Sequence, residues 1–168
     1  MKKNINSFEK IIGIKFKNKN LLLQSLTHKS NNPLNNNEKL EFLGDRVLGL
    51  IISMNLYKLF PKDREGDLDK KLASLVNKKR CVEISNYLSL EDYVLVGDKK
   101  DNSKIENKIL ADTVESIVGA LYLDQGLEVT EKFILNYWKR FLNEKLTIYR
   151  DPKTMLQEYS LKLHKTLP

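Results

Sequence analysis

The sequence is poor in the residues that build disulfide-bonded, zinc-binding or turn-rich proteins. Among its 168 residues there is one cysteine, Cys81, so no internal disulfide can form, and two histidines offer no Cys/His zinc cluster. Glycine and proline together number 11, and no apolar run approaches the roughly 20 residues that span a bilayer. These absences predict a cytoplasmic, helical protein that is not inserted into a membrane.

Acidic residues are outnumbered by basic ones. The chain has 29 Lys and Arg against 22 Asp and Glu, a formal net charge of +7. Such an excess favours a polyanionic partner such as nucleic acid, although the same balance also arises from solubility or from a lysine-rich composition without any partner. With 41% hydrophobic and 30% charged residues, the composition is that of an ordinary globular chain.

Hydrophobic spacing predicts an all-α fold. Apolar residues recur at steps of three and four, whereas the alternation typical of strands is scarce. The expected helices cover residues 6–12, 19–28, 36–59, 67–76, 78–87, 89–92, 103–124 and 126–145. Polar loops separate several of them, at 31–37, 61–67 and 97–104.

The last twenty residues differ in character from the rest. "LTIYRDPKT" contains a proline and is followed by a fresh amphipathic stretch, "TMLQEYSLKLH". We therefore expect residues 1–148 to form one domain that a linker follows, and residues 151–168 to be the beginning of a second domain cut short or a tail that docks elsewhere.

The segment "EKLEFLGDRVLGL" places three carboxylates among residues typical of a protein core. With about 100° per helical residue, Glu38, Glu41 and Asp45 share one narrow arc. The opposite arc is a core-facing stripe of Leu40, Leu43, Val47, Leu50 and Ile51. Because Leu48 and Ile52 continue the acidic arc, this helix is expected to be covered on both faces and to lie centrally.

A second acidic pair lies in "NKILADTVESIVGALYLDQG". Asp112 and Glu115 are one turn apart and share a face with Gly119, opposite an apolar stripe of Leu110, Val114, Ile117 and Leu121. Gly119 lets a neighbouring helix approach closely, and Gly44 or Gly49 can do the same on the first helix. We therefore predict that the two helices cross with their acids facing one another.

Converging carboxylates repel one another and require cations. Lys or Arg can supply the positive charge, but Mg²⁺ prefers oxygen ligands, so the four acids Glu41, Asp45, Asp112 and Glu115 indicate a Mg²⁺ site. Any one of these acids alone is better explained as a solvated helix face. The combination of two clusters on two helices favours the metal site.

Five segments, in order, resemble the bacterial ribonuclease III family. They are "LTHKS", "EKLEFLGDRVLGL", "FPKDREGDLDKKLASLV", "ILADTVESIVGALYLD" and "DPKTMLQEY". The resemblance implies a helical endonuclease domain in residues 1–148 that forms a homodimer. It also implies that residues 149–168 are a linker and the incomplete start of an α+β double-stranded-RNA-binding domain.

The resemblance also implies roles for individual acids. Glu41, Asp45, Asp112 and Glu115 match the family's Mg²⁺ ligands, with Mn²⁺ able to substitute, and Asp45 and Glu115 are taken as catalytic.

Contacts with substrate and partner are assigned in the same way. Glu38 and Glu65 match acidic positions of the substrate cleft, and Phe42 matches an aromatic residue that inserts into the partner subunit. Thr154 and Gln157 match minor-groove contacts of the RNA-binding domain.

The function implied is hydrolysis of double-stranded RNA in staggered cuts that leave 5′-phosphate and 3′-hydroxyl ends, in the processing of ribosomal and other RNAs. No nucleotide cofactor is implied. One alternative is a non-catalytic relative that binds double-stranded RNA, and another is a helical interaction domain whose acids form salt bridges. The intact acids favour the enzyme.

Histidine-pair catalysis is disfavoured, since His28 and His164 are far apart in the sequence. His28 is expected to make a local hydrogen bond or to pack near the cleft.

Three positions depart from the family's pattern: Arg46, Leu72 and Lys108. Arg46, beside Asp45, is expected either to lie along the dimer surface or to pair with an acid. None of the three removes a predicted metal ligand, but the resemblance does not predict how any of these three side chains contacts the substrate.

Overall fold

Helices form the whole regular structure of the described residues, which are 4–97, 104–143 and 160 of the computed structural model. The elements are α1 (Ile5–Ile12), α2 (Lys19–Ser25), α3 (Glu38–Leu59), α4 (Glu65–Leu75), α5 (Lys78–Tyr87), the 3₁₀ helix η1 (Leu90–Asp92) and α6 (Asn107–Asn143). Extended pairing within these residues is limited to an isolated bridge between Thr27 and Leu95. The predicted all-α class is confirmed, and none of the described helices combines the length and apolarity needed to cross a bilayer.

The two helices expected around residues 103–145 form one element with a kink. Gly126 has φ 80° and ψ −173°, outside the helical region, and the chain changes direction there. Only glycine takes a positive φ without a steric cost, so the expected break between the two helices is confirmed, one residue later than expected. The first helix begins at Asn107, four residues later than expected.

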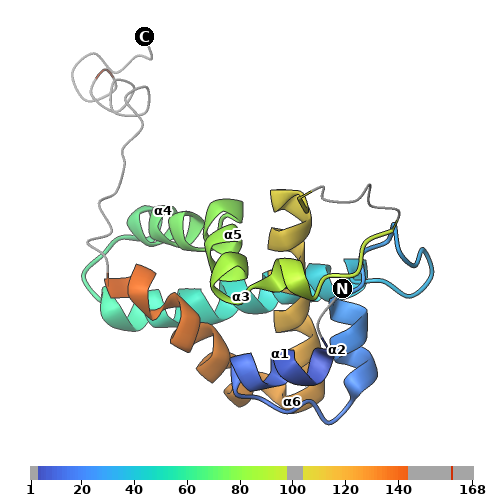
Figure 1. The fold of residues 1–168 in the computed structure, drawn as a ribbon. Helices are drawn as coiled ribbons and strands as arrows, with labels where there is room; N and C mark the ends of the chain where they lie inside the picture. Colours follow the sequence, from blue (N-terminus) through green and yellow to red (C-terminus); the bar gives the residue numbers. More distant parts are fainter. Residues whose placement is uncertain (1–3, 98–103, 144–159, 161–168) are drawn as a thin grey trace.

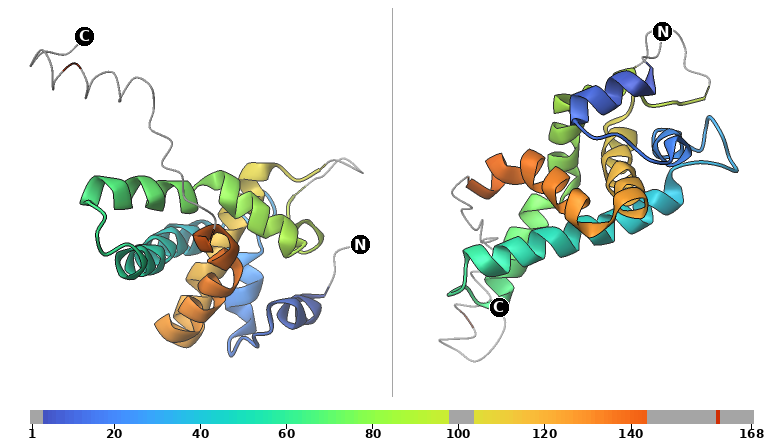
Figure 2. Two further views of the ribbon diagram at one scale, coloured as in Figure 1. Left: turned by 90° about the vertical axis from the view of Figure 1, so that its left-hand side faces the viewer. Right: turned by 90° about the horizontal axis from the view of Figure 1, so that it is seen from below.

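Helix α3 and the first half of α6 cross at the centre of the molecule (Figures 1 and 2). The contact between α3 and α6 is the most extensive between any two elements. A Cβ atom on Gly44 would lie 1.7 Å from the carbonyl oxygen of Glu115, and one on Gly119 would lie 2.2 Å from that of Leu40. The backbones therefore touch at a glycine pair. The prediction is confirmed for Gly119 and Gly44, while the space beside Gly49 is open.

Helix α3 is buried on two sides, as its sequence predicts. Its buried apolar residues are Leu40, Val47, Leu48, Ile51, Ile52 and Leu56. The prediction for Leu50 is wrong, because its side chain is 52% exposed. Leu50 sits at the edge of the core-facing stripe, about 100° from Ile51, and no described element covers that edge.

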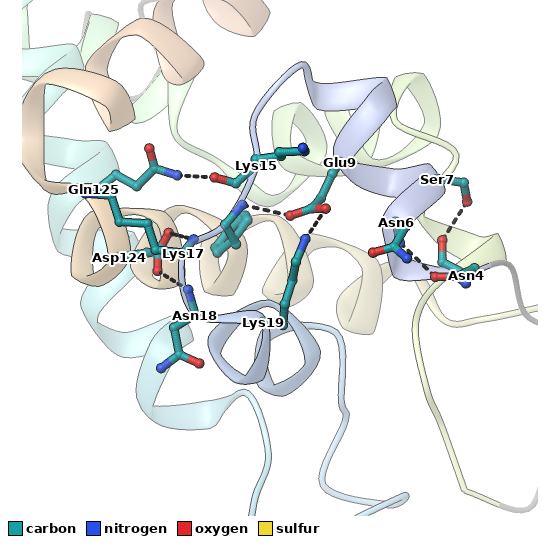
Figure 3. Close-up of polar contacts among 11 residues, drawn as sticks. Asn4, Asn6, Ser7, Glu9, Lys15, Lys17, Asn18, Lys19, Asp124 and Gln125 are labelled. Atoms are coloured by element: carbon teal, nitrogen blue, oxygen red, sulfur yellow. Dashed lines mark hydrogen bonds and ion pairs between the residues drawn. The ribbon is translucent and has the colours of Figure 1, made fainter.

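A buried carboxylate joins α1 to α2 (Figure 3). Glu9, which is 5% exposed, accepts a hydrogen bond of 2.7 Å from the backbone N–H of Phe16 and pairs with the ammonium of Lys19. Burial opposes ionisation of Glu9, but these donors outweigh it and hold its pKa below the ordinary value. Glu9 is therefore a satisfied structural acid.

The loop between α1 and α2 is tied to α6 just before its kink. Both carboxylate oxygens of Asp124 accept hydrogen bonds of 2.8 Å, from the backbone N–H groups of Lys17 and Asn18. The side-chain amide of Gln125 donates to the carbonyl of Lys15 at 2.7 Å (Figure 3). These bonds fix the small N-terminal helices against the first half of α6, and so support the central crossing.

Candidate metal centre

A cavity of about 380 Å³ opens where the N-terminal half of α3 faces the first half of α6. Most of its lining side chains are charged or polar: His28, Lys29, Asn37, Glu38, Glu41, Phe42, Asp45, Arg46, Lys108, Asp112 and Glu115. The four acids predicted as metal ligands all line this one cavity. The helix crossing through Gly44 and Gly119 places them there.

Three of the acids converge closely. Glu41, Asp112 and Glu115 each offer a carboxylate oxygen, and these oxygens lie within 4.8 Å of one another. That span is near the separation of about 4.2 Å between opposite ligands in a Mg²⁺ shell with bonds of about 2.1 Å. A hard divalent cation therefore fits the donor set.

The electrostatics of the cluster also favour a cation. Burial, together with the charges of Asp112 and Glu41, raises the pKa of Glu115 to about 7. Burial and the charge of Asp112 likewise raise the pKa of Glu41. Proximity of carboxylates thus penalises their ionised forms, and a divalent ion among them would remove the penalty.

Asp45, the fourth predicted ligand, lies in the cavity wall but outside the group of three. Its carboxylate pairs with the guanidinium of Arg46, which also lies 5.4 Å from the ring centroid of Phe42. Of the two roles expected for Arg46, the structure shows the pairing with an acid. Arg46, which departs from the family pattern, therefore pairs its positive charge with a predicted metal ligand.

Two lysines pair with acids at the mouth of the cavity. The ammonium of Lys108 lies 2.7 Å from Asp112, and the ammonium of Lys29 lies 2.8 Å from Glu38. The hydrogen bond to Asp112, with its charge, raises the pKa of Lys108. The hydrogen bond from Lys29 lowers the pKa of Glu38. These two lysines therefore supply part of the cavity's positive charge.

Cys81 is a neighbour of the site that the sequence did not indicate. Its side chain on α5 is fully buried, and its thiol lies 3.8 Å from a carboxylate oxygen of Glu115, to which it donates. Burial and the charge of Glu115 raise the pKa of the thiol, so it remains a protonated donor. The spacing of Cys81, Ile84 and Ser85, all buried on one face of α5, was the available signal that the thiol points inward.

Two polar residues complete the wall. His28 makes the expected local hydrogen bond, at 2.8 Å between its Nδ1 and the hydroxyl of Ser30. Asn37, at the start of α3, is 1% exposed, and its side-chain nitrogen has no hydrogen-bond partner within the described part of the chain. A buried amide donor without a partner is costly, which suits a cavity that holds polar ligands.

The remaining predicted residues lie elsewhere. Glu65, at the start of α4, lines a separate, mainly apolar cavity of about 750 Å³ together with Tyr57, Leu68 and Leu72, and does not reach the acidic cavity of its own chain. Thr154 and Gln157 lie outside the described residues. The metal, cleft and RNA-contact roles assigned above therefore stay predictions.

The class of protein that the fold and the cavity define is a helical domain whose two central helices cross beside a cluster of carboxylates. Within this class, the chain matches the Ribonuclease-III-like family over residues 18–141. It is 53% identical over 169 residues to Ribonuclease 3 of Pelagibacter ubique, with 100% of this chain and 76% of the relative covered. Ribonuclease 3 of Campylobacter jejuni is 42% identical over 163 residues, covering 96% of this chain and 70% of the relative.

Solved structures agree. The nuclease domain of the Campylobacter jejuni enzyme, described with a region involved in dimer formation, superposes with a TM-score of 0.78 at 42% identity, covering 82% of this chain and 97% of that one. Dicer from Pichia stipitis, at 22% identity and a TM-score of 0.63, shares the fold, over 91% of this chain and 70% of its own. The chain belongs to the ribonuclease III family.

Proposed function

We propose that the chain is a Mg²⁺-dependent endoribonuclease that hydrolyses double-stranded RNA in staggered cuts to 5′-phosphate and 3′-hydroxyl ends. The observation that carries the proposal is the convergence of Glu41, Asp112 and Glu115 in one cavity of a ribonuclease III fold. Relatives named Ribonuclease 3, at 41–53% identity over most of the chain, support it. Precursors of ribosomal and other RNAs are the substrates that the resemblance suggests.

Each acid has a part in this proposal. Glu41, Asp112 and Glu115 hold the ion, and Asp45, which lines the same cavity, joins them once its carboxylate is released from Arg46. A bound Mg²⁺ ion supplies activation of water and neutralisation of charge on the phosphoryl oxygens. Burial and the charges of Asp112 and Glu41 raise the pKa of Glu115 to about 7, and a cation bound at the cluster would favour the ionised form of Glu115.

Duplex RNA would be held by charge and shape. A-form RNA presents phosphates and 2′-hydroxyls rather than readable base edges, so basic side chains at the mouth of the cavity suit it. Lys29 and Lys108 line that mouth, and the net charge of +7 adds a long-range attraction. Residues 1–148 would form this catalytic unit.

We also propose that two chains form a symmetric dimer through α3 and α4. Phe42 is 67% exposed at the rim of the acidic cavity, and Tyr57, at the apolar cavity, is 75% exposed. Seating Phe42 in the apolar cavity of a second copy would bury both surfaces. Because Glu65 lines that apolar cavity, Glu65 of the partner subunit would then approach the acidic cavity.

Cleavage of an end-labelled RNA duplex tests the catalytic proposal. We expect cutting that requires Mg²⁺, stops with a chelator and yields fragments that a 5′-phosphate-dependent exonuclease degrades. Asp112→Asn should lose this cleavage, whereas Asp92→Asn, outside the cavity, should retain it. A parent protein that binds duplex RNA but never cuts it at saturating Mg²⁺ would support the non-catalytic alternative.

Solution mass tests the dimer. We expect twice the chain mass for the parent and a shift towards one chain mass for Phe42→Ala, since the variant loses the apolar anchor. Leu34→Ala, at a 98% exposed leucine in the loop before α3, is the control and should leave the mass unchanged. An unshifted Phe42→Ala protein would refute this interface.

A further inference from the structure

Lys108 is placed where helix energetics do not favour a lysine. It is the second residue of α6, whose first turn contains no acid, and a cation there opposes the helix macrodipole. Its pairing with Asp112 at i,i+4 also runs in the weaker direction, with the base N-terminal to the acid. By contrast, Glu128 and Lys132 on the same helix pair in the favourable direction. Stability of α6 therefore does not account for Lys108.

Repulsion among the carboxylates of the acidic cavity does account for Lys108. Asp112 is only 17% exposed, and its charge is a cause of the raised pKa of both Glu41 and Glu115. The ammonium of Lys108, 2.7 Å from Asp112, neutralises the carboxylate that repels the other two. The lysine side chain itself is 65% exposed, so it can withdraw into solvent without unpacking the core.

We propose that Lys108 is the resident counter-cation of the acidic cavity: it holds Asp112 in the metal-free protein, yields it to an incoming divalent ion, and thereby sets the ion concentration that the site needs. This inference rests on the metal site proposed above. Lysine and ion compete for one carboxylate, so each bound ion must replace an existing pair. The lysine stabilises the empty site and weakens the filled one.

Calorimetric titration of Mg²⁺ into the RNA-free protein tests this without any cleavage. Lys108→Gln should bind the ion about three- to fivefold more tightly than the parent, the range expected from losing a competing exposed ion pair. Without metal, the melting temperature of Lys108→Gln should be below that of the parent. Saturating Mg²⁺ should raise the melting temperature of the variant more than that of the parent.

The matched control is Lys132→Gln. It removes the same charge from the same helix and breaks a lysine–carboxylate pair that is also 2.7 Å long, far along the chain from the cavity. Equal Mg²⁺ affinity for the two variants, or weaker binding by Lys108→Gln, would overturn the inference. Binding that is the same in the parent and in Glu115→Gln would show that no ion sits at the cluster, and would overturn the metal site as well.

Discussion

Glu9 and Glu115 are both withdrawn from solvent, yet their surroundings are opposite in character. Glu9 faces the N–H of Phe16 and the ammonium of Lys19, and its pKa is lowered. Glu115 faces Asp112 and Glu41, and burial with their charges raises its pKa to about 7. In Glu9 the donors outweigh the effect of burial on the pKa, whereas in Glu115 the neighbouring carboxylates add to it. The partners therefore decide which acid holds the fold together and which one favours a cation.

The sharpest test of this difference is loss of activity. Glu115→Gln should reduce Mg²⁺-dependent cleavage of duplex RNA by about a thousandfold, because an amide cannot neutralise a bound cation. Glu9→Gln should cleave at the parent's rate under conditions where it is folded. Single-turnover cleavage at saturating Mg²⁺ measures both. Similar rates for the parent and Glu115→Gln would remove Glu115 from the site.

The free energy of unfolding should respond more strongly to substitution of Glu9 than of Glu115, the reverse of the order expected for cleavage. Glu9→Gln should lower the free energy of unfolding by about 2 kcal/mol, since charge-assisted hydrogen bonds to Phe16 and Lys19 are weakened. Glu115→Gln, measured without metal, should be at least as stable as the parent because a repelling carboxylate is removed. Urea titrations with EDTA provide the comparison, and Glu128→Gln, at an exposed ion pair, is the control.

Glu9 and Glu115 should also contribute with opposite sign to the pH dependence of stability in the metal-free protein. The pKa of Glu9 is lowered on folding, so its contribution is present above its ordinary value of 4.5 and is lost as the pH falls through the lowered pKa. The pKa of Glu115 is raised, so stability declines as the pH rises from 4.5 to about 7. In Glu115→Gln that decline should shrink. A parent whose melting temperature is constant across this window would contradict the assignment.

The smallest expected effect concerns the thiol beside Glu115. Cys81→Ala removes the donor at 3.8 Å and should raise the Mg²⁺ concentration for half-maximal cleavage by about twofold, while Cys81→Ser keeps a donor and should stay near the parent. In the folded parent, the buried thiol should resist a thiol-reactive dye until the protein unfolds. Rapid labelling of native protein would contradict its burial.

Much of this architecture follows from the sequence by geometry alone. The helical period places Glu41 on one face of α3, and Asp112 and Glu115 on one face of α6, and Gly119 indicates where the helices touch. The inferences about the acids succeed because each concerns a single helix, whose rotation per residue is fixed.

The sequence could not predict what depends on neighbours. The exposure of Leu50 follows from which elements pack beside α3, and the contact of Cys81 with Glu115 joins residues from two helices. Which of its two expected roles Arg46 takes depends on side-chain rotamers. The location of Glu65 in a second cavity depends on how α4 returns along α3.

Anomalous diffraction from crystals soaked in Mn²⁺ tests the central claim most directly, because it locates the ion without reference to cleavage. The account predicts a peak within coordination distance of carboxylate oxygens of Glu41, Asp112 and Glu115, and its absence in crystals of Glu115→Gln. A parent crystal with no peak among these three side chains at saturating Mn²⁺ would contradict it.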